Sequence, residues 1–387
     1  MALSFRAGRI AYLAGSWDHG GFATYYTAGK LLLEGRDPAL NFDPIYFQNQ
    51  LDRIAPPTRD IWINPPALNV FLAPFCWLPL QTAKTIWNLS GLALYLGVLF
   101  GWARSQGLKK ISTPALLIPM LWFYPLYLNL DVGQVYVWMA ALLFLTTWAY
   151  LHKKNALCGI GLSLLLMTKI IGLFAIPLLI VQKRWAVLKA FGITSLAIGL
   201  LSLPLFGWES WLEVGKILFG AGQMESSGAI AYQNLPALIH HVLVRDPFWS
   251  PHAWFHHPHL VRPINLIVVT LLLGVILLSA YRKPFAVRDW LLVFSLGLLL
   301  SPYSLDYHYL LFVPIWANLW SALKADTPTT IRILLIGCLA MIAWPWPKQP
   351  LDYAGFLPLA YPHLIGLLGF MAICAFQKSS LKPDAAI

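Results

Sequence analysis

The chain has 387 residues, of which 58% are hydrophobic and 11% are charged. Soluble proteins carry about 25% charged residues, so this composition excludes an ordinary soluble domain and is typical of a polytopic membrane protein. The net charge of +11 does not indicate nucleic-acid binding, because the basic residues occur as short pairs between apolar runs and gather on no single tail. We therefore expect one all-α membrane domain over residues 1–387.

Residues 1–16 contain Arg6 and Arg9 but no apolar run near the ~20 residues that a spanning helix needs. They also lack the apolar core and the small-residue cleavage site of a signal peptide. The topology derived below requires a spanning helix before residue 17. We therefore expect either that the native reading frame extends upstream of this start or that this start leaves the first outer loop poorly anchored.

Residues 17–66 are predicted to form the first extracytoplasmic loop. The loop holds six of the sixteen acidic residues of the chain: Asp18, Glu34, Asp37, Asp43, Asp52 and Asp60. Carboxylates spaced so closely with Pro and Arg are too polar for lipid. Within the loop, residues 25–34 fit a short amphipathic helix at the membrane interface that stops at Gly35. Residues 65–79 are apolar but short and rich in proline, so we expect them to lie in or dip into the outer interface.

Nine further apolar segments are candidates for spanning helices, at residues 84–103, 112–129, 134–151, 186–206, 262–280, 287–302, 308–323, 331–346 and 358–376. The segment 156–181 decides the topology, since a single crossing would place either Lys153-Lys154 or Lys183-Arg184 outside. Two short helices that meet near Lys169 keep both basic pairs in the cytoplasm. The sequence thus predicts eleven crossings of the plasma membrane, with Lys169 at the outer face and a second large extracytoplasmic loop over residues 207–262.

Five groups of residues, in one order along the chain, resemble a known family. They are GFATYYTAG from Gly21 with LLLEGRDP from Leu31, NPP from Asn64, VGQV from Val132, LMTK ending at Lys169, and SPYSLDYHY from Ser301. Together they resemble glycosyltransferase family 87, a group of membrane enzymes in the GT-C superfamily. The resemblance implies a GT-C-like helical bundle, a polyprenyl-phosphate sugar donor, usually carrying mannose, and an active site at the outer membrane face. The acceptor would be a hydroxyl of a lipid-linked or glycan-linked molecule.

One position departs from the family pattern. The family usually has an aspartate directly before the Phe-x-x-Tyr-Tyr element, and the resemblance implies that this aspartate is the catalytic base. Here that position is Gly21, and the preceding carboxylate is Asp18. Either the flexible Gly20-Gly21 turn lets Asp18 supply the base, which is our expectation, or the chain has lost it. Asp43, Asp52 and Asp60 have no motif partner, and we expect them to matter far less.

Transfer from a lipid-phosphate sugar requires a base beside the attacking hydroxyl and positive charge or hydrogen-bond donors on the departing phosphate. Since phosphate leaves without an acid, one carboxylate suffices, and a single displacement would invert the anomeric centre. Lys169, in the middle of an interrupted apolar run, is the expected phosphate partner. The alternative for this side chain is a lysine that snorkels to the interface.

Four other residues are candidates for the site. His308 matches the histidine of the family's Ser-Pro-x-Ser-x-x-x-His element. It fits either a catalytic role at the phosphate or the acceptor, or packing at the membrane interface. Gln134 fits binding of sugar hydroxyls or helix packing in equal measure. Tyr25 and Tyr26 fit stacking on a sugar ring or anchoring at the interface, and we expect one of the two to be an anchor.

No metal and no cofactor are expected. The stretch HAWFHHPH at residues 252–259 invites a zinc site, but it has no second cluster of Cys or of His and Glu at ligand spacing. The chain contains no Asp-x-Asp, which disfavours a metal-bound nucleotide sugar, and no Walker-type loop for ATP. Two alternatives stay open: a transporter or flippase for lipids such as polyprenyl phosphate, which shares broken helices, and a catalytically inactive homologue.

Overall fold

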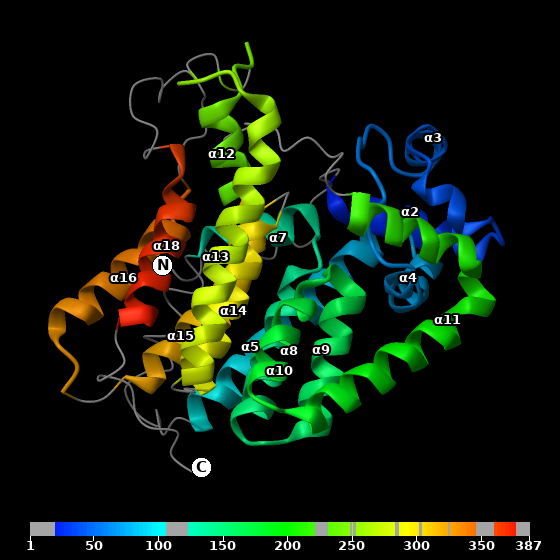
Figure 1. Ribbon diagram of the computed structural model, residues 1–387. Helices are drawn as coiled ribbons and strands as arrows, with labels where there is room; N and C mark the ends of the chain where they lie inside the picture. The colour runs from blue at the N-terminus through cyan, green and yellow to red at the C-terminus, as the bar shows by residue number, and fades with distance from the viewer. Residues whose placement is uncertain are drawn as a thin grey trace, which may run out of the picture.

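The computed structural model describes residues 20–105, 123–220, 231–247, 250, 253–282, 286–301, 304–323, 326–345 and 360–376. These residues form α-helices and short 3-10 helices (η), with one isolated β-bridge between Asp246 and Ser250 (Figure 1). The predicted all-α class is confirmed. In chain order the helices are α2 (Gly21–Leu33), η1 (Pro38–Phe42), α3 (Pro44–Ile54), α4 (Ala67–Leu72), η2 (Ala73–Trp77), α5 (Leu80–Ser105), α7 (Tyr124–Val132), α8 (Tyr136–Leu151), α9 (Asn155–Lys169), η3 (Ile171–Phe174), α10 (Ala175–Val181), α11 (Trp185–Gly220), α12 (Leu235–Leu243), η4 (Pro258–Leu260), α13 (Val261–Arg282), α14 (Ala286–Leu300), η5 (Asp306–Leu311), α15 (Phe312–Ala322), α16 (Thr329–Ala343) and α18 (Pro362–Phe376).

The eleven predicted crossings are not confirmed. Among the described residues, three helices are long and apolar enough to cross a membrane, at Leu80–Ser105, Trp185–Lys216 and Pro258–Arg282. The other apolar helices found there have 10–17 residues, which is fewer than the ~20 of a full span. Left-handed residues end two of the apolar runs early, since Gly133 has φ +66° and Ile170 has φ +58°. The predicted span 112–129 lies mostly outside the described residues.

The helix α2 differs from the predicted interfacial helix in both extent and burial. It begins at Gly21 instead of residue 25 and ends before Gly35, whose φ of +68° favours glycine, as predicted. Every residue from Gly21 to Gly29 is buried, because α2 packs against α3, α4, η2 and α5. This half of the helix is therefore an internal element rather than an amphipathic helix with one exposed face.

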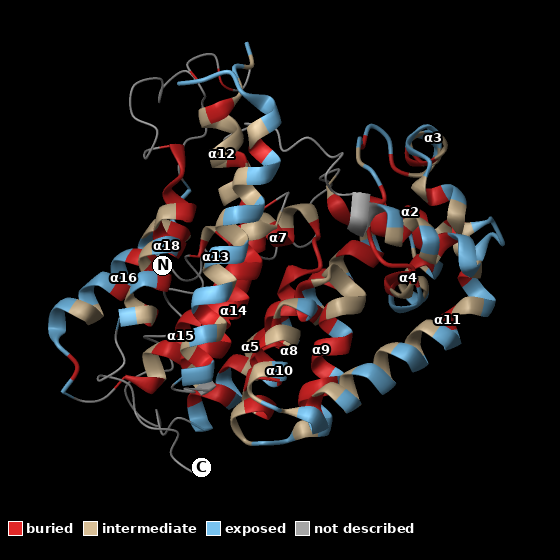
Figure 2. Ribbon diagram, viewed as in Figure 1, coloured by how far each residue is buried: buried red, intermediate tan, exposed pale blue. Residues whose placement is uncertain are grey.

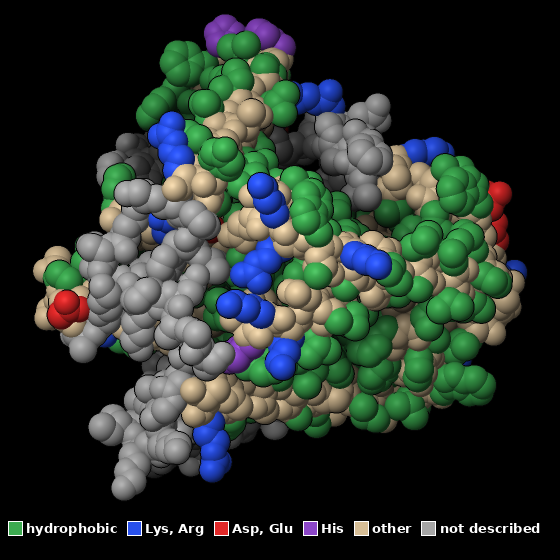
Figure 3. Space-filling view, turned by 60° about the horizontal axis from the view of Figure 1, so that its bottom comes forward, with side chains coloured by type: hydrophobic (Ala, Val, Ile, Leu, Met, Phe, Trp, Pro, Cys, Tyr) green, Lys and Arg blue, Asp and Glu red, His purple; other side chains and the backbone are tan. Residues whose placement is uncertain are grey.

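The helices α8, α9 and α10 form a folded-back unit that connects the two ends of the bundle. The helix α9 packs against α8 and stops at Lys169, which confirms the predicted break there. The turn between α8 and α9 carries the exposed Lys153 and Lys154, and the turn after α10 carries Lys183 and Arg184. Both basic turns thus lie at the end of the unit opposite to Lys169. Figure 3 shows Lys and Arg side chains spread over this end of the molecule, with few acidic ones.

The second predicted loop, residues 207–262, begins inside a continuous helical stretch. The helix α11 runs diagonally along the outside of the bundle and bends sharply at Gly207, where φ is +67° and ψ is +170° (Figure 1). Pro204 precedes the bend and removes a helical hydrogen bond. Beyond the bend the loop contains the rest of α11 and the short helix α12.

The core lies between α5, α8, α14 and α15, and Figure 2 shows buried residues, in red, gathered in the middle of the bundle. Trp290 of α14 stacks on Tyr150 of α8 with ring centroids 4.0 Å apart, and its indole N–H donates to the Thr147 hydroxyl at 3.0 Å. Trp87 of α5 packs against Trp138 of α8 at 5.3 Å. These aromatic contacts fix α5, α8 and α14 relative to one another and support the helix ends at which the polar residues lie.

Candidate active site

A polar cavity of about 220 Å³ lies where six separate stretches of the chain meet. Four of the six residues predicted from the sequence line it: Tyr25, Gln134, Lys169 and His308. The lining also includes Thr24, Asp60, Asn64 and Tyr307, to which the sequence analysis assigned no role in the site. The structure therefore brings together residues as distant in sequence as α2 and η5.

Two glycines, one at the start of α2 and one at the end of α7, allow close packing in one wall of the cavity. Gly133 ends α7 in the left-handed conformation, and a Cβ at this position would lie 2.5 Å from the Cβ of Phe22. A Cβ at Gly21 would lie 1.9 Å from Nε2 of Gln134. The position that carries the aspartate in the family pattern is thus filled by the Gln134 side chain.

Tyr25 is fixed in this wall by a hydrogen bond and by aromatic contacts. Its hydroxyl donates to Oε1 of Gln134 at 2.5 Å. Its ring meets Trp62 edge-on with centroids 6.3 Å apart. Burial raises the pKa of Tyr25 well above its usual value, and the nearby Tyr307 and Asp60 add to the rise. The phenol therefore stays protonated and acts as a hydrogen-bond donor rather than as a base.

Asp60 brings a carboxylate into the cavity from the segment between α3 and α4. The Thr24 hydroxyl donates to its Oδ2 at 2.6 Å, and the Ile61 backbone N–H donates to its Oδ1 at 2.8 Å. A carboxylate offers about four acceptor positions, so both oxygens of Asp60 can accept a further hydrogen bond. Asp60 was not predicted from the sequence to belong to the site. Its position four residues before Asn64 was the available signal.

Other carboxylates of the first loop serve the local fold instead. Asp43 caps α3 by accepting from the backbone N–H groups of Ile45 and Tyr46, at 2.8 and 3.0 Å. Asp37 caps η1 in the same way. Asp52 is exposed and accepts from Gln48 at 2.9 Å. Such roles are the ordinary ones for aspartate at helix ends and on helix surfaces.

Lys169 enters the cavity from the C-terminal end of α9. The following residue, Ile170, adopts a left-handed conformation and starts the 3-10 turn η3, so the lysine stands at a helix break. Lys169 is half-buried, and Asp60 lies close enough for a favourable charge interaction with it. A cation and a carboxylate therefore face the same small volume.

His308 lies in η5 and packs against two aromatic rings. The imidazole centroid is 4.2 Å from the ring of Tyr136 and 4.8 Å from that of Tyr307. Its buried Nδ1 atom has no hydrogen-bond partner among the described residues. Asn64 also lines the cavity with a buried side-chain oxygen that makes no hydrogen bond within that part of the chain. Buried polar atoms are nearly always satisfied, so these two are suited to a polar ligand.

Two predicted site residues are not among those that line the cavity. Tyr26 points away and donates its hydroxyl to the Leu78 backbone carbonyl at 2.8 Å. Its role as an anchor at the membrane interface stays a prediction. Asp18 lies outside the described residues, and its relation to the cavity stays a prediction. Among the described residues no cluster of His, Cys, Asp and Glu could hold a metal ion. Part of the predicted His-rich stretch 252–259 is not described.

The fold and the cavity define a helical membrane protein with a polar site at the ends of apolar helices. The model of a protein family described as Glycosyltransferase family 87 matches residues 62–302, which is more than half of the chain. The chain therefore belongs to glycosyltransferase family 87 and is a membrane glycosyltransferase. The match includes Asn64, Gln134 and Lys169. Comparisons with curated proteins and with solved structures gave no match.

Proposed function

We propose that the protein transfers a hexose, mannose in the first instance, from a polyprenyl-phosphate donor to a hydroxyl of a lipid-linked or glycan-linked acceptor. The observation that carries the proposal is the joint presence of a carboxylate, a lysine and an imidazole in one cavity of a family 87 chain. The volume of about 220 Å³ is below that of most whole-ligand sites, so the cavity would receive the reacting sugar and phosphate while the prenyl chain stays in lipid.

We assign the general base to Asp60. Gly21 and Thr24 are three residues apart and therefore share one face of α2. Since Thr24 holds Asp60, the Asp60 carboxylate reaches the same helix face from which the family aspartate at position 21 would project. Its unused acceptor positions can take the proton of the acceptor hydroxyl as that oxygen attacks the anomeric carbon. The bond from this carbon to the phosphate oxygen breaks in the same step, and the centre inverts.

Lys169 and His308 are the proposed partners of the phosphate. The ammonium group would offset the negative charge that develops on the departing oxygen, and the imidazole would donate a hydrogen bond to the same phosphate. Gln134 and Asn64 supply amide groups that can bind sugar hydroxyls. Tyr25 keeps the Gln134 amide oriented through its hydrogen bond.

The distribution of charge supports an extracytoplasmic site. The basic turns Lys153-Lys154 and Lys183-Arg184 lie at the end of α8, α9 and α10 that is remote from Gln134 and Lys169. The helix α8 has 16 residues and is about 24 Å long, so the Lys153-Lys154 turn at its end lies about that far from Gln134 at its start. Basic loops stay in the cytoplasm, so the cavity would face outward across the plasma membrane.

Transfer of labelled hexose from a panel of polyprenyl-phosphate sugars in membranes tests the proposal. We expect Asp60→Asn to lower the transfer rate by about 10²- to 10⁴-fold, the usual worth of a positioned base, while donor binding survives. Asp52→Asn is the matched control, because it removes an exposed carboxylate from the same loop. Its rate should stay within about twofold of the wild type.

The competing outcomes are distinct. Full turnover by Asp60→Asn together with loss in Asp18→Asn would assign the base to Asp18. If neither variant loses transfer activity, neither carboxylate is the base, and His308 is the next candidate. A wild-type chain that moves the lipid across vesicles without transferring any sugar of the panel would support the transporter alternative and refute the proposed reaction.

A further inference from the structure

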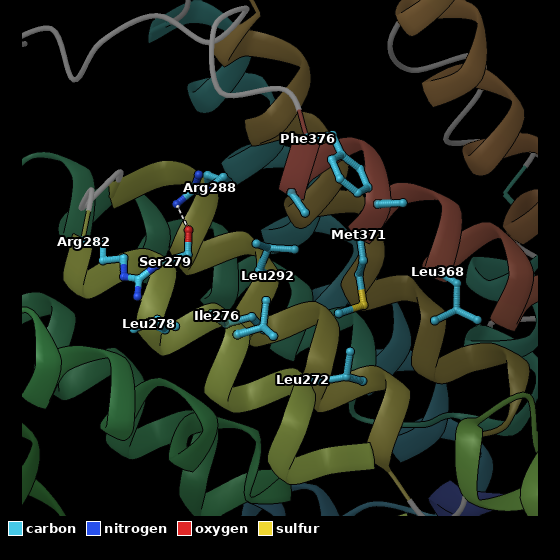
Figure 4. Close-up of a pocket in the computed structure, with 13 residues that line it drawn as sticks. Leu272, Ile276, Leu278, Ser279, Arg282, Arg288, Leu292, Leu368, Met371 and Phe376 are labelled. Atoms are coloured by element: carbon cyan, nitrogen blue, oxygen red, sulfur yellow. Dashed lines mark hydrogen bonds between the residues drawn. The ribbon is translucent and has the colours of Figure 1, made fainter. Parts of the chain in front are cut away.

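A second cavity, unrelated to the polar site, opens on the outside of the bundle. Its volume is about 860 Å³, and it lies between α13 and α18, with α14 along its floor (Figure 4). Leu272 and Ile276 come from α13, Leu292 from α14, and Leu368 and Met371 from α18. The helix α13 belongs to one of the three candidate spans, and little of that span is buried in the protein. The groove is therefore an apolar depression at membrane depth.

Two arginines lie together at one end of this apolar groove. Arg282 ends α13 and is exposed, and Arg288 lies in the first turn of α14 with only 1% of its surface accessible (Figure 4). Among the described residues Arg282 makes no hydrogen bond or ion pair. An exposed cation at the mouth of an apolar groove is the arrangement that a lipid with a charged head would match.

Arg288 contributes to the same end, although part of its charge is neutralised. Its Nε and Nη2 atoms donate to Oδ1 of Asp289 at 2.9 and 2.6 Å, and Nη2 also donates to the Ser279 hydroxyl at 2.8 Å. The remaining nitrogen, Nη1, carries two N–H groups that take no part in these bonds. Arg282 thus supplies the net positive charge, and Arg288 supplies spare donors beside it.

We propose that this groove binds one anionic phospholipid. The phosphate of the head group would bind Arg282 and the spare donors of Arg288, and an acyl chain would lie along Leu272, Ile276 and Leu368. The chemistry favours a phospholipid over a partner helix. Its charged head group matches the end of the groove that carries the arginines, and its apolar chain matches the apolar remainder of the groove. A volume of about 860 Å³ falls in the range of sites that hold small ligands.

The lipid site is separate from the sugar site. The groove meets the beginning of α14, at Arg288 and Leu292, whereas the polar cavity lies beyond the end of this helix, at residues 305–308. The 15 residues of α14 correspond to about 22 Å. The proposal therefore does not depend on the reaction assigned to the polar cavity.

Binding of phosphatidylglycerol and phosphatidylcholine to the purified full-length chain, measured by native mass spectrometry in one detergent, tests the inference. We expect one phosphatidylglycerol to bind more tightly than phosphatidylcholine, and Arg282→Gln to weaken it about tenfold, since a hydrogen bond to a charged group is lost. Arg262→Gln is the matched control. This exposed arginine lies near the other end of the same helix, and its loss should leave binding unchanged.

A second variant tests the apolar part of the groove without touching the charges. Ala372 lines the groove from α18 and is exposed, so Ala372→Trp should leave the fold intact. The indole should fill the groove and abolish the tight binding of phosphatidylglycerol. Equal affinities for the two lipids, equal losses in Arg262→Gln and Arg282→Gln, or retention by Ala372→Trp would each overturn the proposal. So would complete displacement by inorganic phosphate, because the site would then take a free anion.

Discussion

Gly21 packs so closely against Gln134 that an added methyl group must displace this side chain. In Gly21→Ala the new Cβ would lie 1.9 Å from Nε2 and 2.6 Å from Cδ of Gln134. Both atoms belong to the far end of a flexible side chain, so we expect α2 to remain and the amide to rotate away. The hydrogen bond from the Tyr25 hydroxyl to Gln134, now 2.5 Å long, would be lost in a buried place.

The magnitude follows from the loss of this one contact. A buried donor left without its acceptor destabilises a protein by about 1–3 kcal/mol. The better helix propensity of alanine offsets at most about 1 kcal/mol. We therefore expect Gly21→Ala to lower the free energy of unfolding by about 1–2 kcal/mol. Gly97→Ala in α5 is the control, because nothing lies within 4 Å of its added carbon.

A double-mutant cycle with Gln134→Ala, followed by denaturant unfolding in one detergent, gives the decisive measurement. Gly21→Ala and Gln134→Ala remove the same hydrogen bond, so the double variant should be about as stable as Gln134→Ala alone. Additive losses in the free energy of unfolding would refute the reasoning, since they would mean that positions 21 and 134 do not contact each other. The same contact affects Gly21→Asp, because restoring the family aspartate requires Gln134 to leave its place.

Two further predictions concern the frame of the cavity. Lys169→Cys should react with a membrane-impermeant thiol reagent added outside, with little background because the four native cysteines are buried, and labelling only after permeabilisation would reverse the proposed orientation. Asp306→Ala should destabilise the fold by about 1–3 kcal/mol in thermal unfolding, because it leaves the buried Nδ1 of His363, now 3.0 Å from the carboxylate, without this polar neighbour. The control Asp306→Asn keeps the shape and a polar group beside His363 and should lose less, and equal losses would contradict a stabilising contact between the two side chains.

Several parts of the site could be predicted because they lie at backbone features that the sequence displays. Gln134 follows a glycine that ends a helix, and Lys169 interrupts an apolar run between two basic pairs. His308 follows a Ser-Pro pair in the sequence and lies in η5, directly before α15. The charge pattern assigned Lys169 to the outer face, and the structure places Lys169, Gln134 and His308 on one cavity.

The number of crossings could not be predicted in the same way. Hydropathy measures how apolar a segment is, but the length of a helix depends on where its backbone bends. For example, Gly207 bends α11 without ending its helical stretch, so this helix continues beyond the predicted span 186–206. Likewise, the burial of α2 depends on α3, α4 and η2 folding around it, which no periodicity within residues 21–33 displays.

Asp60 shows why an unusual position in a family pattern is better judged in space than in sequence. The sequence offered Asp18 as the nearest carboxylate to Gly21, because distance along the chain was the only available measure. In the structure, a carboxylate 36 residues beyond Thr24 is bound to it at 2.6 Å, one helical turn from Gly21. A chain that lacks an aspartate at position 21 therefore still presents a carboxylate to the cavity, and Gly21 alone is no argument for an inactive homologue.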